Sequence, residues 1–166
     1  MEGTYPLPEA QLDRFLLRVD VPSPSAAGVV HILEANQAAH GELEPLLSGA
    51  EVLELQSITA SLPASSDILE PAARTVVATH ASAETAPDSV RRHVRYGASP
   101  RGAQAMLGAA RARALLAGRL HCTIDDLAAV VQPCLRHRLV LTYEGEAEEV
   151  TPEDVVTRVL NSVEVA

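Results

Sequence analysis

The residues of this chain best suited to chemistry are Ser99, Pro100 and Arg101, which follow a glycine at position 97. The Ser99 hydroxyl can cap a helix, and Pro100 suits the first helical position, where its missing N–H has no consequence. Arg101 then falls in the first turn, where the helix dipole opposes a cation by a few tenths to about 1 kcal/mol. A bound anion would reverse that sign, because N–H groups and guanidinium would point at the same phosphate. The alternative is a solvated arginine on an ordinary capped helix.

Four blocks of sequence resemble parts of one protein family. They are residues 96–103 (Tyr-Gly-Ala-Ser-Pro-Arg-Gly-Ala), 109–119, 2–15 and 135–141. They are similar to stretches in the C-terminal part of MoxR-family AAA+ ATPases, and the resemblance runs from end to end of the chain. It implies a mainly α-helical fold. Residues 22–166 are expected to form the helical-bundle lid domain, and residues 1–21 a remnant of the α/β core that carries its arginine-finger segment and last strand.

The resemblance also implies roles for two arginines. In the family, the arginine of the Ser-Pro-Arg motif is the sensor 2 residue, which contacts the terminal phosphates of the nucleotide. Here that residue is Arg101, with Ser99 and Pro100 beside it. The arginine of the Leu-Asp-Arg-Phe motif is the arginine finger, which reaches the nucleotide of the neighbouring subunit, and here it is Arg14. Without the resemblance, Arg14 would be interpreted as a surface arginine.

The phosphate-binding loop of such ATPases is missing from this sequence. The chain has no Gly-x-x-x-x-Gly-Lys-[Ser/Thr] segment and no lysine at all. That loop needs consecutive backbone N–H groups, a lysine on the β- and γ-phosphates and a hydroxyl on Mg²⁺. We therefore expect ATP and Mg²⁺ to bind in the complete protein, whose AAA+ core would supply the loop that this sequence lacks. The chain alone is expected to bind no cofactor and to hydrolyse no ATP.

For the complete protein, the resemblance implies ATP hydrolysis in a ring, expected to be a hexamer. It also implies chaperone-like remodelling of client proteins or cofactor insertion, beside proteins with von Willebrand factor A domains. The alternative, from another class of function, is a stand-alone helical module that binds a protein partner and has no nucleotide role. Burial of the Arg101 guanidinium in a salt bridge, far from Arg14 and Phe15, would favour that alternative.

Charge is unevenly distributed along the chain. The net charge is −9, which argues against nucleic acid and anionic membranes as general partners. Residues 89–124 nevertheless contain no acidic residue and seven arginines: Arg91, Arg92, Arg95, Arg101, Arg111, Arg113 and Arg119. Such a basic zone suits one phosphate-bearing ligand or an acidic neighbouring subunit. Neutralisation by acids brought near in the folded chain is the alternative.

The cysteines and histidines give little indication of chemistry. Cys122 and Cys134 form no CxxC pair and no signal peptide precedes them, so reduced thiols and a cytoplasmic location are expected. The six histidines do not pair at helical spacing and are not spaced with the cysteines as zinc ligands, so no metal site is predicted. Cys122 beside His121 is disfavoured as a nucleophile and base, because sequence neighbours rarely face each other. The longest apolar runs are too short to span a membrane.

Apolar spacing and capping residues place the elements. Helices are expected at residues 26–39, 49–61, 67–80, 100–117 and 124–137 and from 152 onward, with a turn at 89–94. Ser66 is expected to cap the third helix, and Thr123 with Asp126 to form a capping box. Residues 15–21 are predicted to form a strand, and residues 139–143 an extended segment.

The first two helices each carry an apolar face that is expected to be buried. These faces comprise Val29, Ile32 and Leu33 in the first helix, and Val52, Leu53, Leu55 and Ile58 in the second. Because the chain has only four aromatic residues, the core is expected to consist of Leu, Val, Ile and Ala.

Overall fold

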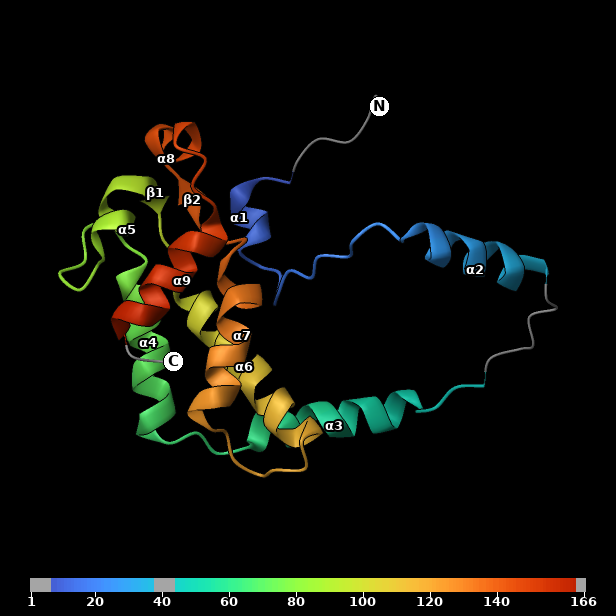
Figure 1. Cartoon of the computed structure of the whole chain (residues 1–166). Coiled ribbons are helices and arrows are strands. Elements are labelled where there is room, and N and C mark those ends of the chain that lie inside the picture. The colour runs from blue at the N-terminus through green and yellow to red at the C-terminus, as the bar shows by residue number, and fades with distance from the viewer. Residues whose placement is uncertain (1–6, 38–43, 164–166) are drawn as a thin grey trace. The chain divides into compact units, whose positions relative to one another are not determined.

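The computed structural model describes residues 7–37 and 44–163, which are mainly helical (Figure 1). Its elements are α1 (Glu9–Leu12), α2 (Ala26–Gln37), α3 (Gly49–Ser61), α4 (Ser66–Ala78), α5 (Asp88–His93), β1 (Val94–Tyr96), α6 (Pro100–Leu116), α7 (Ile124–Leu135), β2 (Val140–Leu141), α8 (Tyr143–Ala147) and α9 (Pro152–Val163). The mainly α-helical fold class predicted from the sequence is confirmed. In the described part of the chain, no helix is long and apolar enough to cross a membrane.

The described residues divide into two compact units. The larger unit holds residues 7–18 and 58–163, and the smaller unit holds residues 19–37 and 44–57. In the larger unit, α6 packs against α4 and α7, and α9 packs against the same two helices. Its largest fully buried apolar side chains are aliphatic or sulfur-containing, as the scarcity of aromatic residues predicts: Met106, Leu127, Leu135, Val90, Val131, Val155, Val156, Val159 and Cys134.

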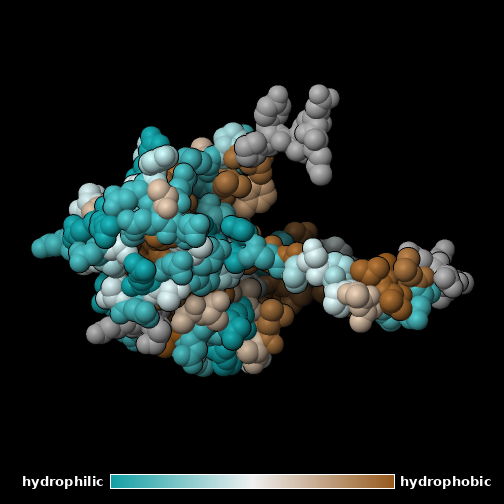
Figure 2. Space-filling model, turned by 45° about the horizontal axis from the view of Figure 1, so that its top comes forward, coloured by the Kyte–Doolittle hydropathy of each residue, from teal (hydrophilic) through white to brown (hydrophobic). Residues whose placement is uncertain are grey.

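The apolar faces of α2 and α3 are not buried, and here the sequence prediction was wrong. Leu33 of α2 and Leu53 of α3 are 58% and 66% exposed, and the other residues of both predicted faces are exposed as well. Hydrophobic residues accordingly appear at the surface in the space-filling view (Figure 2). The periodicity correctly indicated helices, but among the residues that the structure describes no element buries these faces. The predicted end of α2 at residue 39 lies outside the described residues.

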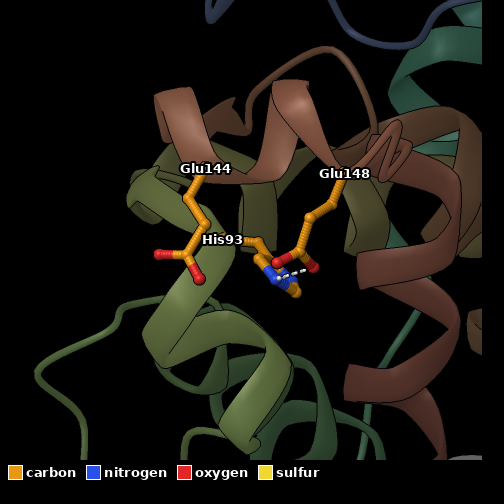
Figure 3. A group of neighbouring side chains, drawn as sticks. All are labelled: His93, Glu144 and Glu148. Atoms are coloured by element: carbon orange, nitrogen blue, oxygen red, sulfur yellow. Dashed lines mark ion pairs between the residues drawn. The ribbon is translucent and has the colours of Figure 1, made fainter.

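A two-stranded antiparallel sheet pairs β1, which follows α5, with β2, which precedes α8. Val94 of β1 lies opposite Leu141 of β2, which confirms the extended segment predicted at residues 139–143 in its central part. Directly after β2, the short helix α8, which the sequence analysis missed, brings Glu144 and Glu148 over His93 at the end of α5 (Figure 3).

The strand predicted at residues 15–21 is not formed. Residues 15 and 16 lie in a bend, and residues 17–21 have no regular secondary structure. Side chains from the end of α7 occupy the backbone carbonyls of this segment, which leaves them unavailable for a ladder with another strand. Arg138 donates to the Leu16 carbonyl at 3.2 Å, and Arg136 donates to the Arg18 carbonyl at 2.7 Å.

Local capping rules placed most helix starts correctly. Ser99 accepts a hydrogen bond from the Arg101 amide, and Thr123 forms the predicted capping box with Asp126. The cap predicted at Ser66 is wrong, because Ser65 occupies the N-cap position of α4 and makes no side-chain cap hydrogen bond. The end of α6 follows the expected rule, since Gly118 adopts a φ of 72°, which residues with a Cβ rarely tolerate.

The capping carboxylate of α7 also holds the end of α6. Asp126 is buried and accepts two hydrogen bonds from Arg119, at 2.6 and 2.7 Å, and one from the Thr123 amide at 3.0 Å. Arg113 lies 3.5 Å from the same carboxylate. The pKa of Asp126 is held well below its ordinary value, chiefly by the hydrogen bonds from Arg119 and then by those from Thr123.

We expect Asp126→Asn to lower the free energy of unfolding by about 1–3 kcal/mol, because Arg119 and the Thr123 amide lose their buried charged acceptor. Urea denaturation at neutral pH measures this change, and Asp125→Asn, an exposed neighbour in the same turn, is the matched control. The folded-state pKa is the lower one, so the stabilisation is fully present above the unfolded pKa of about 3.9 and is lost as pH falls below it. Equal stability of the two variants would show that the Arg119 pair contributes nothing.

Candidate functional site

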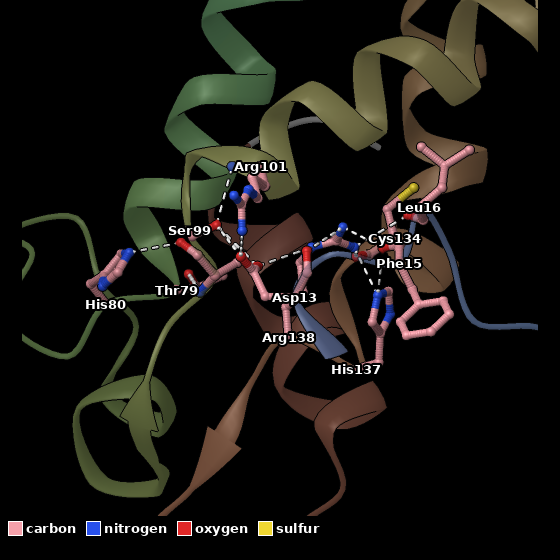
Figure 4. A network of polar contacts seen from close by, with 11 residues as sticks. Asp13, Phe15, Leu16, Thr79, His80, Ser99, Arg101, Cys134, His137 and Arg138 are labelled. Carbon is pink, nitrogen blue, oxygen red and sulfur yellow. Dashed lines mark hydrogen bonds and ion pairs between the residues drawn. The ribbon is translucent and has the colours of Figure 1, made fainter. Parts of the chain in front are cut away.

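The loop that leads into α6 is fixed against the end of α4. The Ala98 amide donates to the Thr79 hydroxyl at 2.9 Å, and His80 Nε2 lies 2.9 Å from the Ala98 carbonyl oxygen (Figure 4). A Cβ at Gly97 would lie 2.6 Å from the Thr79 carbonyl oxygen. Glycine is therefore required here by close backbone approach, and not by a positive φ, which Gly97 does not adopt. The start of α6 is held in place by this contact.

Ser99 and Pro100 play the structural parts that their sequence positions predict. The Ser99 side chain accepts a hydrogen bond from the Arg101 amide at 3.2 Å, and Pro100 is the first residue of α6. The same hydroxyl donates to the carboxylate of Asp13, with its two oxygens at 2.8 and 3.0 Å. Ser99 therefore both caps α6 and ties it to the segment that carries Arg14.

Arg138 holds residues 13–16 of that segment against the helical unit. Its side chain is 2% exposed, and its guanidinium donates to the carbonyls of Phe15, at 2.5 Å, and Asp13, at 3.2 Å. It also contacts the Cys134 carbonyl and lies 3.3 Å from the Asp13 carboxylate (Figure 4). Burial lowers the pKa of Arg138 while Asp13 raises it, and an arginine guanidinium stays charged in proteins.

Two further contacts fix the segment to the end of α7. The Arg18 amide donates to the Pro133 carbonyl at 2.8 Å, which satisfies an oxygen at the helix end. His137 Nε2 lies 3.1 Å from the Phe15 carbonyl oxygen, and burial is the main cause of its lowered pKa. Residues 13–18 are thus attached to the helical unit through backbone groups.

The two predicted arginines lie at one pocket. The pocket has a volume of about 270 Å³ and is lined by residues from the N-terminal segment, α6 and the end of α7: Asp13, Arg14, Leu16, Arg101, Gln104, Ala105 and Arg138. Arg101 is 56% exposed, and its Nη1 lies 3.7 Å from Asp13 Oδ2. Arg14 is exposed at the same opening. Two exposed guanidiniums that line one pocket, only one of them near a carboxylate, make this a surface suited to an anion.

The basic zone of the sequence is partly neutralised in the fold. Arg92 pairs with two glutamates of α8, and Arg113 and Arg119 pair with Asp126. For these three arginines, the interpretation of charges balanced in three dimensions is correct. Arg101 differs because the acid beside it, Asp13 at 3.7 Å, also accepts from Ser99 and pairs with Arg138.

Sequence reasoning missed Asp13 and Arg138, which position the predicted residues. Arg138 lies in one of the blocks that resemble the family, and that block is the only signal that could have singled it out. Its contacts with residues 13–16 cross more than 120 positions of sequence, so no local pattern indicates them.

Neither cysteine is placed for catalysis. Both are free and buried, and burial raises the pKa of Cys122 and raises that of Cys134 to about 11. A nucleophilic cysteine needs an accessible thiolate, so both thiols are unsuited to that role.

Comparisons with known proteins agree with these observations. Residues 86–159 match a family described as the AAA lid domain. Chaperone MoxR1 of Mycobacterium tuberculosis is 38% identical over 98% of this chain and 43% of its own length. Uncharacterized protein YeaC of Bacillus subtilis is 34% identical over 99% of this chain and 49% of its own length. The chain thus spans about half the length of these curated relatives.

A solved structure has the same fold. The crystal structure of a "putative ATPase" from Cytophaga hutchinsonii superposes with a TM-score of 0.89 at 28% identity, and the match covers 97% of this chain and 49% of that one. The helix with Ser99, Pro100 and Arg101 and the strand pair at its side both lie within the matched lid region. Residues 86–159 thus match the AAA lid domain, and the chain as a whole is similar to about half the length of MoxR-family chaperones and of a solved ATPase.

Proposed function

We propose that this chain couples nucleotide state to lid position in a complete MoxR-like ATPase. Arg101 acts as sensor 2 on the terminal phosphates, with Ser99 and Pro100 shaping the helix start that presents it. Arg14 acts as the arginine finger toward the nucleotide of the neighbouring subunit. ATP and Mg²⁺ are held by the AAA+ core, and residues 1–21 belong with that core while residues 22–166 form the lid.

One observation carries this proposal. Arg101 is exposed at the N-terminal end of α6, and Asp13 connects it to the segment of Arg14 at the same pocket. A guanidinium in the first turn opposes the helix dipole, and a phosphate bound there would remove the opposition. Core residues that supply the phosphate-binding loop would complete the arrangement.

The biological setting is part of the same proposal. The complete protein forms a hexameric ring in the cytoplasm and uses ATP hydrolysis to remodel client proteins or insert cofactors, as a chaperone. Its partners are the AAA+ core, neighbouring subunits and a protein with a von Willebrand factor A domain, and not nucleic acid or membranes. The printed name of the M. tuberculosis relative, Chaperone MoxR1, supports the chaperone part.

We expect Arg101→Ala to lower kcat for ATP hydrolysis about 100- to 1,000-fold, the usual cost of losing one donor that stabilises developing charge. The measurement uses a chimaera in which this chain replaces the matching 43% of M. tuberculosis Chaperone MoxR1, so that a nucleotide-binding core is present. Steady-state phosphate release gives kcat and KM.

Arg74→Ala is the matched control, because Arg74 is an exposed arginine of α4 away from the pocket. The purified 166-residue chain alone is expected to release no phosphate. Wild-type turnover by an Arg101→Ala chimaera would contradict the sensor role. Turnover by the isolated chain would show that the missing core is unnecessary.

A helical module that binds a protein partner is the second candidate. The exposed apolar residues of α2 and α3 favour it, since apolar side chains at a surface are suited to protein contacts. Arg101 is exposed beside Arg14 and is not in a buried salt bridge. The ATPase proposal requires this arrangement, whereas a protein-binding module does not.

A further inference from the structure

His93 lies beneath two carboxylates on the side of the lid that carries the strand pair. Its Nε2 is 3.2 Å from Glu148 Oε2, and one donor atom from each of His93, Glu144 and Glu148 lies within 4.8 Å of the other two. The histidine comes from the end of α5, Glu144 comes from α8, and Glu148 is the C-cap residue of α8 (Figure 3). A nitrogen and two carboxylate oxygens thus converge from two helices.

The backbone holds these helices together closely. The Thr142 amide donates to the His93 carbonyl at 2.8 Å, and the Thr142 hydroxyl donates to the Arg92 carbonyl at 3.0 Å. A Cβ at Gly145 would lie 3.1 Å from the His93 Cβ and from its carbonyl oxygen. Glycine at 145 therefore lets α8 rest directly on the end of α5, and the spacing of four residues puts both glutamates on one face.

The histidine itself is incompletely satisfied. His93 is 4% exposed, and neither of its ring nitrogens makes a hydrogen bond, although Nε2 approaches Glu148 as an ion pair. Buried polar groups in folded proteins are normally hydrogen-bonded, so a buried imidazole directed at two carboxylates without a hydrogen bond needs an explanation. A cation between the three side chains would provide one.

In this structure Arg92 forms ion pairs with both carboxylates. Its Nη2 lies 3.0 Å from Glu144 and 3.1 Å from Glu148, and its side chain is 58% exposed. The two glutamates carry two negative charges, and Arg92 balances only one of them. An exposed arginine can move into solvent at little cost, which would free both carboxylates for another cation.

We propose that His93, Glu144 and Glu148 form a binding site for a divalent transition-metal ion, with Zn²⁺ as the ion that fits the donor set best. Imidazole nitrogen and carboxylate oxygen are both accepted by Zn²⁺, and three protein ligands leave a fourth position for water. The two half-exposed glutamates can rotate to close around the ion, while the buried histidine stays fixed. The ion would fasten α8 to α5 and displace Arg92.

His93 lies 51 and 55 positions before the two glutamates in sequence, so a search for local ligand spacing could not bring the three residues together. The proposed metal site is also separate from the proposed nucleotide site, because His93, Glu144 and Glu148 do not line the pocket of Arg14 and Arg101. The inference therefore stands or falls independently of the proposed ATPase function.

Isothermal titration of the metal-free chain with Zn²⁺ tests the site. We expect one Zn²⁺ per chain, and a loss of affinity of at least about 10-fold in both His93→Gln and Glu148→Gln. Glu146→Gln, on the same helix but outside the cluster, is the matched control and should bind as wild type. Arg92→Gln should bind more tightly, because the competing cation is removed.

Two results would overturn the site. The first is that the wild-type chain takes up no Zn²⁺. The second is that His93→Gln or Glu148→Gln binds Zn²⁺ with wild-type affinity, which would place the ion at other histidines or cysteines. Circular dichroism reports whether each variant is folded. Because Glu148 is half-exposed, its variant decides the question even if the buried His93→Gln variant unfolds.

Discussion

Arg14→Ala is expected to lower kcat for ATP hydrolysis by about 1,000-fold or more in the chimaera with the MoxR1 core, the scale on which arginine fingers act. An arginine finger neutralises charge that develops on the transferred phosphoryl group, so its loss acts on kcat more than on KM. Arg14 is exposed at the mouth of the pocket, where a neighbouring subunit could be reached. Phosphate release measured over a range of ATP concentrations separates kcat from KM.

A mixing experiment determines whether Arg14 acts between subunits. Arg14→Ala subunits retain their own phosphate-binding loop, and subunits with that loop inactivated retain Arg14. If the finger acts in trans, mixed rings should recover hydrolysis that neither variant shows alone. Full activity of Arg14→Ala by itself would end the finger assignment, and no recovery in stable mixed rings would place its action within one subunit.

Arg138→Met is expected to release residues 13–18 from the helical unit, with a loss of about 3 kcal/mol in the free energy of opening this segment. The change removes every hydrogen bond from the guanidinium to the carbonyls of Asp13, Phe15 and Leu16, and leaves Asp13 without its buried partner. Hydrogen exchange of the Arg18 amide, which donates to Pro133, should accelerate about 100-fold.

The helical core should respond much less to Arg138→Met than the segment does, because the packing of α4, α6, α7 and α9 is untouched. Arg158→Met, at an exposed position of α9, is the control for loss of an arginine. Unchanged exchange at Arg18 would mean that the backbone bond to Pro133 suffices to hold the segment. In the chimaera, the same variant should also lower hydrolysis, because Arg14 would lose its fixed position.

The helical architecture was predictable because its signals are local. Ser99 with Pro100, Thr123 with Asp126, and Thr151 with Asp154 start helices through hydrogen bonds that span two or three residues. Such bonds depend on residue types at fixed spacing and little else. The two arginines of the candidate site were singled out by another route, because their short motifs resemble those of a known family and local patterns alone would leave Arg14 as a surface arginine.

What the sequence could not indicate depends on contacts between distant segments. Residues 15–21 have the alternation of a strand, but Arg138 and Arg136 occupy the carbonyls that a ladder would need. The apolar faces of α2 and α3 were correctly located on helices and wrongly expected to be buried, because periodicity shows which face is apolar and not what covers it. The approach of His93 to Glu148 likewise arises only in the fold.

The hydrogen bond between Ser99 and Asp13 has a mechanical consequence. The finger segment and the start of α6 belong to one compact unit and are joined by a side-chain bond one residue from Arg14 and two from Arg101. Any swing of this unit as a rigid body carries both guanidiniums through the same rotation. In the complete ATPase that we propose, this bond would link the core segment of Arg14 to the lid helix of Arg101, so that a lid moved by its own nucleotide would also shift the charge presented to the neighbouring subunit.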